Sequence, residues 1–516
     1  GADVVIAVDV GTKLAGKDEM KNALSIIYQM SGLLTVRNTN DQIETLHEND
    51  VLISPEIGDL VTSADFNKLD EAVTLGYAAT VAVEHELRKY SLTEAEYETW
   101  RHRIETCVAG PPRINFVRLD NQSRFSDEVI LNLITIEPGK PLDLVQLDKD
   151  LRQIYGLGFI RQARYSIIKN DDQQGIEITV LQDERGEDFI ETGLDLSFSG
   201  RGSSINLRGA YLKTDLDERG SELRAMVQLG ESPLIFAEYY KSLDDRLRYS
   251  ISPSASILSR PLLIFDGNRD AVAEIELDEI GAAIAINRDF GRHARATAGF
   301  TRYTGEMNVT VGEPEQKPFS FDGAEAFVEL EFDRLDDRYL PTRGVYAMLK
   351  YTSSFESLGA DIDFDQWEFS IYGNHSFGRH NLLWGGIYEI SSDNVSNYLD
   401  PPIYAWYTAG GFLKMSGYEP NALVGPQFGM VVAGYRYQVA QSGFLPGYVG
   451  ATLEYGNVAL ERKNIFSDGL LNGSVYFAYN TPIGPIYLGV GWSEERSALY
   501  FLRLGTIFGA RSLGRR

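Results

Sequence analysis

Serines, aspartates and six histidines are the residues of this sequence that could carry out covalent chemistry. Acyl transfer by a serine needs an adjacent base, and the common nucleophile elbow places a glycine two residues to each side of the serine. The sequence has no G-x-S-x-G, and the nearest context, GNHSFG around Ser376, has the wrong spacing. A D-G-A triplet at residues 322–324 lies where we expect a barrel loop, so we attribute it to chance. We therefore predict no catalytic residue.

Histidine and cysteine spacing does not indicate a metal site either. Structural and catalytic metal sites gather several such ligands at characteristic spacings. Cys107 is the only cysteine of the chain. The histidines fall on separate expected helices and strands or in expected turns: His47, His85, His102, His293, His375 and His380. We expect neither a metal nor a cofactor.

Bulk composition excludes two classes of protein. The chain has 516 residues, of which 43% are hydrophobic, so it is long enough for two or three folded units. It lacks the run of about 18 apolar residues that a membrane-spanning helix requires. A formal net charge of -26 argues against nucleic acid as a partner, because phosphates require a basic surface.

The stretch at residues 498–508 (ALYFLRLGTIF) has two chemically different faces. Successive side chains of a strand point to opposite sides, so Arg503 falls on one face and a row of apolar residues on the other. That row is Tyr500, Leu502, Leu504 and Phe508. Only a closed sheet satisfies every backbone group in hydrocarbon. We therefore predict that this stretch is the closing strand of a transmembrane β-barrel.

Residues 187–516 repeat this pattern of alternating polarity, with Gly, Asn, Asp and Ser between the segments. Period-two segments separated by turn residues indicate an antiparallel barrel or sandwich, and Tyr and Trp at strand ends favour a membrane barrel. At roughly 20 residues per strand and connection, the region accommodates about sixteen strands. The expected fold class is therefore mainly β, with an antiparallel barrel as the largest domain.

Residues 110–186 have the pattern of a small α+β domain. Pro111 and Pro112 mark its start, because two prolines cannot continue a helix. The expected order is strand, helix, helix, strand, strand, with Ser126 and Asp143 as helix caps. The segment 139–160 (GKPLDLVQLDKDLRQIYGLGFI) resembles a polypeptide-transport-associated (POTRA) domain. The resemblance implies a periplasmic module, and we expect Tyr155 and Phe159 in its core.

Residues 1–109 have the pattern of part of an α/β domain. Two short apolar runs, at 4–8 and 51–54, predict strands of a parallel sheet, and helices are expected after them. The opening GADVVIAVDV resembles the strand that follows the catalytic aspartate in bacterial patatin-like phospholipases. That family uses a Ser-Asp dyad, whose two motifs lie before the matching region. The resemblance thus leaves enzyme status open, and we expect the chain as given to be inactive.

Two barrel stretches resemble motifs of the outer-membrane insertase and two-partner transporter superfamily. One is the turn at residues 333–344 (DRLDDRYLPTRG), whose motif residues are Asp333, Asp336, Pro341 and Gly344. The other is residues 410–418 (GGFLKMSGY), which resemble the long sixth loop that folds back into the barrel lumen. Its motif residues are Lys414, Ser416, Gly417 and Tyr418.

The lumen motif departs from the family at one position, because Ser416 stands where the family has an arginine. An inward arginine usually pairs with an acid on the barrel wall. We therefore expect this contact to be absent here or to be replaced through Lys414.

The order of a patatin-like segment, a POTRA domain and a barrel resembles type Vd autotransporters over the whole chain. The resemblance implies a bacterial outer-membrane translocator that carries a lipid acyl hydrolase to the cell surface. It also implies contact with outer-membrane lipids and with the barrel-assembly machinery during insertion, and it leaves homo-oligomerisation open. The alternative is an insertase or transporter barrel that serves a separate client protein.

Overall fold

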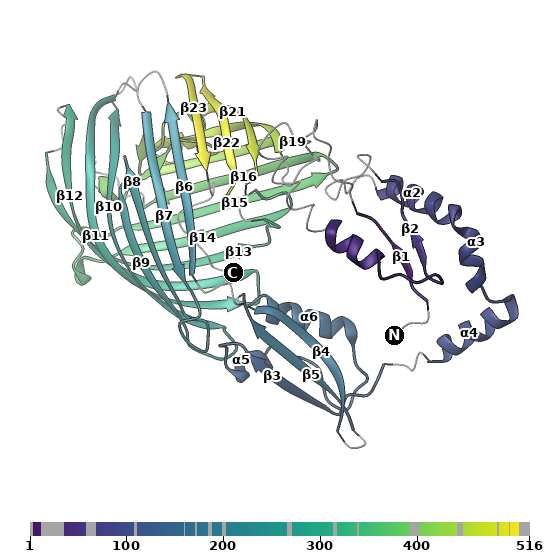
Figure 1. The fold of residues 1–516 in the computed structure, drawn as a ribbon. Coiled ribbons are helices and arrows are strands. Elements are labelled where there is room, and N and C mark those ends of the chain that lie inside the picture. Colours follow the sequence, from purple (N-terminus) through teal and green to yellow (C-terminus); the bar gives the residue numbers. More distant parts are fainter. Residues whose placement is uncertain are drawn as a thin grey trace. The chain divides into compact units, whose positions relative to one another are not determined.

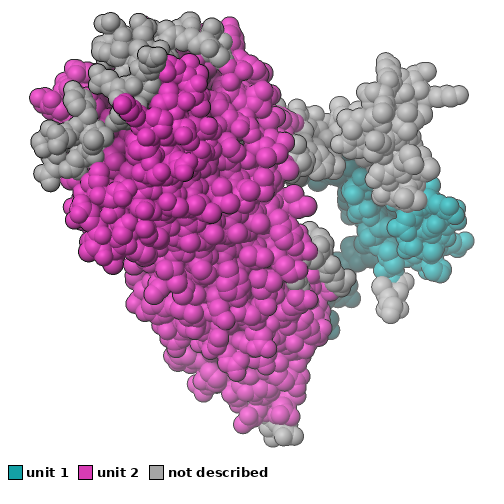
Figure 2. All heavy atoms as spheres, turned by 90° about the vertical axis from the view of Figure 1, so that its left-hand side faces the viewer, with its two compact units in different colours: residues 1–110, 441–444 teal, residues 111–440, 445–516 magenta. Residues whose placement is uncertain are grey.

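The chain forms two compact units, residues 1–110 with 441–444 and residues 111–440 with 445–516, which Figure 2 shows in different colours. The computed structural model describes residues 4–11, 36–57, 69–107, 111–158, 160–170, 173–183, 188–198, 203–265, 271–312, 317–337, 340–392, 402–440, 447–481, 484–494 and 496–504.

The first unit combines a short parallel sheet with helices (Figure 1). Strands β1 (Ile6–Val8) and β2 (Val51–Ile53) pair in parallel. The helices that follow are α2 (Leu69–Ala82), α3 (Glu84–Leu87), η2 (Arg88–Tyr90) and α4 (Glu94–Cys107). Within the described part of the chain, no helix has both the length and the apolar composition needed to cross a membrane.

The second unit begins with a small α+β domain, the one whose sequence resembles a POTRA domain, and we refer to it by that name. Its elements are β3 (Phe116–Gln122), α5 (Asp127–Leu131), α6 (Leu144–Tyr155), β4 (Ile160–Asn170) and β5 (Gln173–Gln182). The sheet order is β3-β5-β4, with β3 parallel and β4 antiparallel to β5. Ser126 caps α5 through the amide of Val129, and Asp143 caps α6. This is the predicted order of elements.

One core residue of this domain was predicted wrongly. Tyr155 is 58% exposed, whereas Ile154 beside it is fully buried. The last turn of α6 therefore directs the isoleucine, and not the tyrosine, towards the sheet, because neighbouring helical positions point about 100° apart. Phe159 lies outside the described residues.

A closed barrel follows the POTRA domain. Its sixteen described strands are β6 (Asp188–Phe198), β7 (Ser203–Lys213), β8 (Glu222–Gly230), β9 (Leu234–Ser242), β10 (Tyr249–Phe265), β11 (Ala271–Phe290), β12 (Ala294–Gly312), β13 (Phe319–Asp333), β14 (Gly344–Ser354), β15 (Asp365–Phe377), β16 (His380–Ser391), β19 (Gln427–Ala440), β20 (Gly447–Ala459), β21 (Leu470–Tyr479), β22 (Ile486–Ser493) and β23 (Arg496–Leu504). Each strand pairs antiparallel with its neighbours, and β23 pairs with β6 to close the sheet. The predicted antiparallel barrel of about sixteen strands is confirmed.

The prediction that the D-G-A triplet lies in a barrel loop is wrong. Residues 322–324 belong to β13 and pair with β12 through Asp322↔Thr304 and Ala324↔Arg302. The acidic and glycine residues suggested a turn, but the strands on this side of the barrel are long enough to include them.

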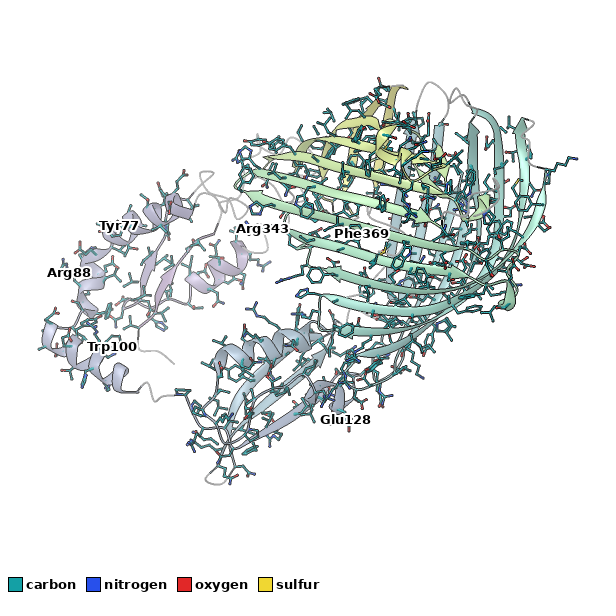
Figure 3. The ribbon with its side chains drawn as sticks, turned by 180° about the vertical axis from the view of Figure 1, so that it is seen from behind. Tyr77, Arg88, Trp100, Glu128, Arg343 and Phe369 are labelled. Atoms are coloured by element: carbon teal, nitrogen blue, oxygen red, sulfur yellow. The ribbon has the colours of Figure 1, made fainter. Side chains whose placement is uncertain are left out.

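Inward and outward side chains alternate along the barrel strands. On β23, Tyr500 is 59% exposed, whereas Leu499 and Phe501 on either side of it are buried. Arg503 is partly buried and forms an ion pair with Asp195, its cross-strand partner on β6 (Arg503 Nη2–Asp195 Oδ2 2.6 Å). Exposed apolar side chains such as Phe369 on β15 mark the outer face (Figure 3). Phe508 lies outside the described residues.

This alternation makes a prediction for the closing strand. A Leu502→Arg substitution should destabilise the inserted barrel by about 2 to 4 kcal/mol if the position is near mid-membrane, because it places a charge on the lipid-facing side. The measurement is the fraction of heat-modifiable, folded protein on a gel. The control is Arg503→Lys, which retains a cation opposite Asp195 and should assemble normally. Equal loss of folded protein in both variants would contradict the register.

Candidate functional site

The barrel lumen contains a long loop, residues 402–426, between β16 and β19, which we call the lumen loop. It includes η4 (Ile403–Ala405) and the short hairpin of β17 (Tyr407–Ala409) and β18 (Leu423–Gly425). Six of its buried apolar residues share one cluster with inward side chains of the barrel strands, and Ile403 and Tyr404 belong to a second cluster. The loop residues of the first cluster are Ala409, Phe412, Leu413, Met415, Tyr418 and Ala422. The loop is therefore packed against the inner wall.

The predicted motif residue Ser416 binds an acid on that wall. Its hydroxyl donates to Glu454 Oε1 over 2.5 Å, and its amide donates to Glu454 Oε2 over 2.6 Å. Both residues are fully buried. Thr452 also donates to Glu454, and the amide of Gly417 donates to Asn472 Oδ1 over 3.3 Å. The loop is thus bound to β20 and β21 by hydrogen bonds to one buried carboxylate and one amide.

We expected the arginine contact to be absent or to be replaced through Lys414, and in the structure Ser416 itself contacts an acid on the wall. Both the hydroxyl and the backbone amide of Ser416 donate to the Glu454 carboxylate. Lys414 instead places its ammonium 5.3 Å from the centre of the Phe428 ring. A serine reaches Glu454 because the loop backbone lies directly on the wall, so no long side chain is needed.

Two glycines allow this close approach. A Cβ atom on Gly491 of β22 would lie 1.8 Å from the carbonyl oxygen of Ser416, and one on Gly417 would lie 2.5 Å from the amide nitrogen of Ser493. Side chains at these positions would overlap with backbone atoms. Gly417 and Gly491 therefore set the distance between the lumen loop and β22.

Aromatic packing connects the lumen loop to the closing strand. Phe412 stacks on Phe501 of β23 with ring centres 4.7 Å apart, and it meets Tyr476 edge-on at 4.9 Å. Tyr487 of β22 completes the group at 5.5 Å from Phe412. The loop thus contacts the inner side of the strand that closes the barrel on β6. Tyr418 is also buried in the apolar cluster.

The turn motif of residues 333–344 joins β13 to β14. Asp336 accepts hydrogen bonds from the amides of Thr342 and Arg343 and from the Thr342 hydroxyl. Gly344 has φ 105°, and a Cβ atom there would lie 2.0 Å from the carbonyl oxygen of Arg334. Asp333 accepts from the amide of Leu335. The motif residues therefore define a compact turn that bears Arg343 at its exposed end (Figure 3).

A buried arginine, which the sequence did not single out, holds this turn to the lumen. The Arg436 guanidinium of β19 donates to the carbonyl of Pro341 and to the side chains of Asn374 and Asn381. Leu340 of the turn joins the same apolar cluster as the lumen loop. The structure therefore brings the two motifs onto one cluster inside the barrel.

The turn should weaken at low pH. Partial burial raises the pKa of the Asp336 carboxyl, but hydrogen bonds from Thr342 and Arg343 outweigh this effect and hold the pKa below its ordinary value. A carboxyl with a lowered folded pKa stabilises above its unfolded pKa of about 3.9 and loses that contribution as pH falls through the folded pKa. Asp336→Ala should cost about 1 kcal/mol at pH 7, since solvent screens this exposed group. Hydrogen exchange of the Thr342 and Arg343 amides measures both effects. Equal protection factors at pH 7 and pH 3 in the parent chain, after correction for the intrinsic pH dependence of amide exchange, would contradict the predicted pH effect.

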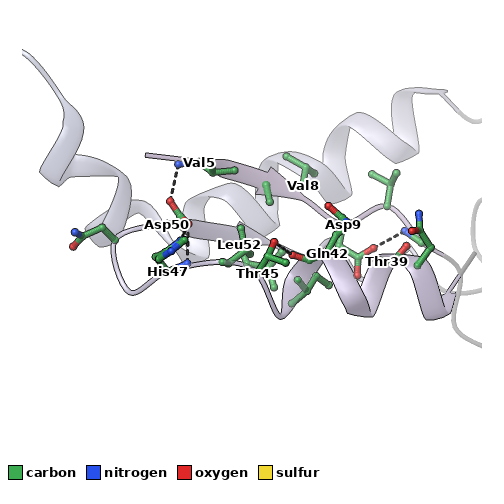
Figure 4. Close-up of a pocket in the computed structure, with 16 residues that line it drawn as sticks. Val5, Val8, Asp9, Thr39, Gln42, Thr45, His47, Asp50 and Leu52 are labelled. Carbon is green, nitrogen blue, oxygen red and sulfur yellow. Dashed lines mark hydrogen bonds and ion pairs between the residues drawn. The ribbon is translucent and has the colours of Figure 1, made fainter. Parts of the chain in front are cut away.

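The first unit has an open pocket of about 1060 Å³ between its short sheet and the helix at residues 36–43 (Figure 4). Asp50 beside it accepts the amides of Val5 and His47, and these hydrogen bonds, that of His47 first, hold the pKa of its carboxyl below the ordinary value. The described residues that line the pocket include no serine or cysteine. Across the described residues, no three His, Cys, Asp or Glu side chains lie close enough to bind a metal. The hydrogen bond from the Val5 amide to Asp50 connects the residue before β1 to the residue before β2.

Because the sequence has no G-x-S-x-G elbow, we expect that a serine-hydrolase probe will not label this chain. Acyl transfer requires a nucleophile, a base and oxyanion donors in one place. A fluorophosphonate probe should leave the purified chain unlabelled, with a serine esterase as the positive control. Stoichiometric labelling of one serine would contradict the prediction.

Two family comparisons match the second unit. The Omp85 superfamily domain matches residues 198–495, and POTRA, described as a surface antigen variable number repeat, matches residues 112–185. Neither match extends to residues 1–111. A search of curated proteins found no match.

Several solved structures share the fold. BamA from Haemophilus ducreyi lacking POTRA domains 1-3 is 12% identical with a TM-score of 0.57, and the match covers 76% of this chain and 85% of that one. CdiB from Escherichia coli is 12% identical with a TM-score of 0.53 and coverages of 75% and 76%. CdiB from Acinetobacter baumannii is 10% identical with a TM-score of 0.50 and coverages of 76% and 74%. At these identities the likeness concerns the fold.

The Omp85 match spans more than half of the chain, and it includes both the lumen loop and the turn motif. The protein therefore belongs to the Omp85 superfamily, and its closed barrel of sixteen strands with a POTRA domain places it in the bacterial outer membrane.

Proposed function

We propose that the protein is the translocator of a type Vd autotransporter, which carries a patatin-like lipid acyl hydrolase to the cell surface. The observation that carries the proposal is the lumen loop, which fills part of the barrel but is held there by Ser416, Gly417 and a non-covalent apolar cluster. A translocator lumen must be closed at rest and cleared for its client. A loop attached at two ends and bound through a few side chains satisfies both requirements.

The first unit supports a passenger of the α/β class. Parallel strands normally lie in sheets that are covered on both faces. Here Val5, Ile6 and Val8 around β1 are 43%, 53% and 55% exposed, although Val51 and Ile53 of β2 are buried. An apolar strand of this kind is expected in the sheet of a larger α/β domain, as the patatin resemblance implies.

The alternative function is a barrel that serves a separate client protein. The observation that favours it is the first unit itself, which packs as a compact body with a pocket that shows no serine or cysteine in its described lining. Such a body would act as a docking module in the periplasm. In either case we expect the barrel-assembly machinery to insert the protein, with membrane lipids against exposed residues such as Tyr500 and Leu488.

The two functions place the first unit on opposite sides of the outer membrane. The test uses His85→Cys, at a side chain that is 76% exposed on α3, in a Cys107→Ser background that removes the only native cysteine. Intact cells are treated with a membrane-impermeant maleimide. Labelling without permeabilisation is the expected result.

The control is the same variant after the outer membrane has been permeabilised, which reports total accessible thiol. Labelling only after permeabilisation would place the unit in the periplasm, reject the passenger proposal and favour the docking module. The Cys107→Ser parent should remain unlabelled throughout.

A further inference from the structure

The hydrophobic core of the POTRA domain extends into the barrel. Leu247 lies in the turn between β9 and β10, yet it packs against the buried POTRA cluster that contains Phe125, Val129 and Ile130. Its backbone has φ 52°, a left-handed conformation that is costly for leucine. A residue held in such a conformation is fixed by its surroundings. The POTRA core is therefore completed by a barrel residue.

A second barrel turn, between β7 and β8, contacts the start of α5. The amide of Ser126 donates to the carbonyl oxygen of Glu218 over 2.9 Å. The buried ring of Phe125 lies against Gly220, where φ is 70° and a Cβ atom would be 2.8 Å from the ring. Only glycine suits both the backbone and the space at this contact. We call residues 214–221 and 243–248 the junction turns.

Polar contacts from other POTRA elements reach the same turns. Gln182 at the end of β5 donates to Asp215 Oδ2 over 3.0 Å, and Asp215 is itself buried with φ 57°. Asn132 after α5 accepts from Arg246 Nε over 3.3 Å and reaches the carbonyl of Asp245. The contact is thus distributed over three parts of the POTRA domain.

An ion pair connects the two junction turns, and hydrogen bonds stabilise each turn internally. Arg219 of the first turn pairs with Asp245 of the second (Nε–Oδ1 2.7 Å). Asp217 accepts from Ser221, and Asp244 accepts from the amides of Arg248 and Tyr249. Two turns with this many internal bonds present a preformed surface to the POTRA domain.

We propose that the junction turns are part of the POTRA fold, so that the POTRA domain and the barrel move as one rigid body. A POTRA domain that swung away would expose Leu247 and Phe125 and would break the bonds to Glu218 and Asp215. The strained conformations of Asp215 and Leu247 would also lose the contacts that maintain them. Opening of the lumen must then come from the lumen loop or the barrel wall. This inference does not depend on which client the barrel serves.

The test measures the distance distribution between two spin labels on the full-length chain in detergent. One label is at Lys149 on α6, the other at Arg379 in the turn between β15 and β16, and Cys107→Ser removes the only native cysteine. We expect one narrow distribution in the parent chain. Leu247→Asn removes the apolar contact while supplying a residue that tolerates φ above zero, so the distribution should broaden.

The matched control is Leu243→Asn, which changes an exposed leucine of the same turn and should leave the distribution narrow. If Leu247→Asn does not assemble, Gln182→Ala tests the junction from the POTRA side without altering the barrel, and it should also broaden the distribution. A broad distribution in the parent chain would overturn the proposal. So would a distribution that stays as narrow in the junction variant as in the Leu243→Asn control.

Discussion

Replacement of Glu454 by alanine is expected to release the lumen loop from the barrel wall. The substitution leaves the hydroxyl and the amide of Ser416 without their acceptor in a fully buried site. Each unsatisfied buried donor costs about 1 to 3 kcal/mol, so the bound state of the loop should lose about 2 to 6 kcal/mol. The loop should therefore leave the wall in a large fraction of molecules.

Tryptic cleavage after Lys414 measures this release. Lys414 is flanked by the buried residues Leu413 and Met415, so the bond is protected while the loop is bound. Faster cleavage at this site in Glu454→Ala, with the barrel still heat-modifiable, is the expected result. Glu454→Gln keeps one acceptor oxygen and should give an intermediate rate.

The matched control is Glu368→Gln. Glu368 is also an inward carboxylate, and its hydrogen-bonded partner is Lys350 on the neighbouring strand (Nζ–Oε1 2.9 Å) instead of Ser416. This variant should cleave at Lys414 as slowly as the parent. If Glu454→Ala and Glu368→Gln cleave at the same rate, Glu454 does not hold the loop.

A methyl group added at Gly491 of β22 should also release the lumen loop from the wall, in this case by steric overlap. In Gly491→Ala, the new Cβ would lie 1.8 Å from the Ser416 carbonyl oxygen, so either the loop or the strand must move. Overpacking of this kind typically costs about 1 to 3 kcal/mol, and more where both sides are backbone. Because β22 is held by hydrogen bonds to β21 and β23, we expect the loop to move.

The readout is again cleavage at Lys414, together with secretion of the client. Gly209→Ala on β7 is the control, because a Cβ atom there would meet nothing within 4 Å. A folded Gly491→Ala barrel with full protection of Lys414 would show that the loop does not lie on β22 as described.

Much of the fold was predictable because it follows from short-range rules. Alternation of polarity with period two places Tyr500 outward and Phe501 inward, and this regularity indicates a barrel of about sixteen strands. The caps Ser126 and Asp143 were predictable for the same reason, since a cap bonds an amide two or three residues away. Tyr155 was assigned wrongly because composition alone does not define which helical position faces the sheet.

The functional contacts were beyond prediction because they join residues that are distant in the sequence. Ser416 meets Glu454 38 residues away, and Arg436 binds the carbonyl of Pro341 95 residues away. Alternation marks Glu454 as inward but does not distinguish it from other inward acids such as Glu368. The sequence does not distinguish Leu247 from other leucines in turns, because its packing against the POTRA core is a tertiary contact. The sequence determined which side chains face the lumen, whereas closure of the barrel and the packing of loop and turns onto it decided which of them meet.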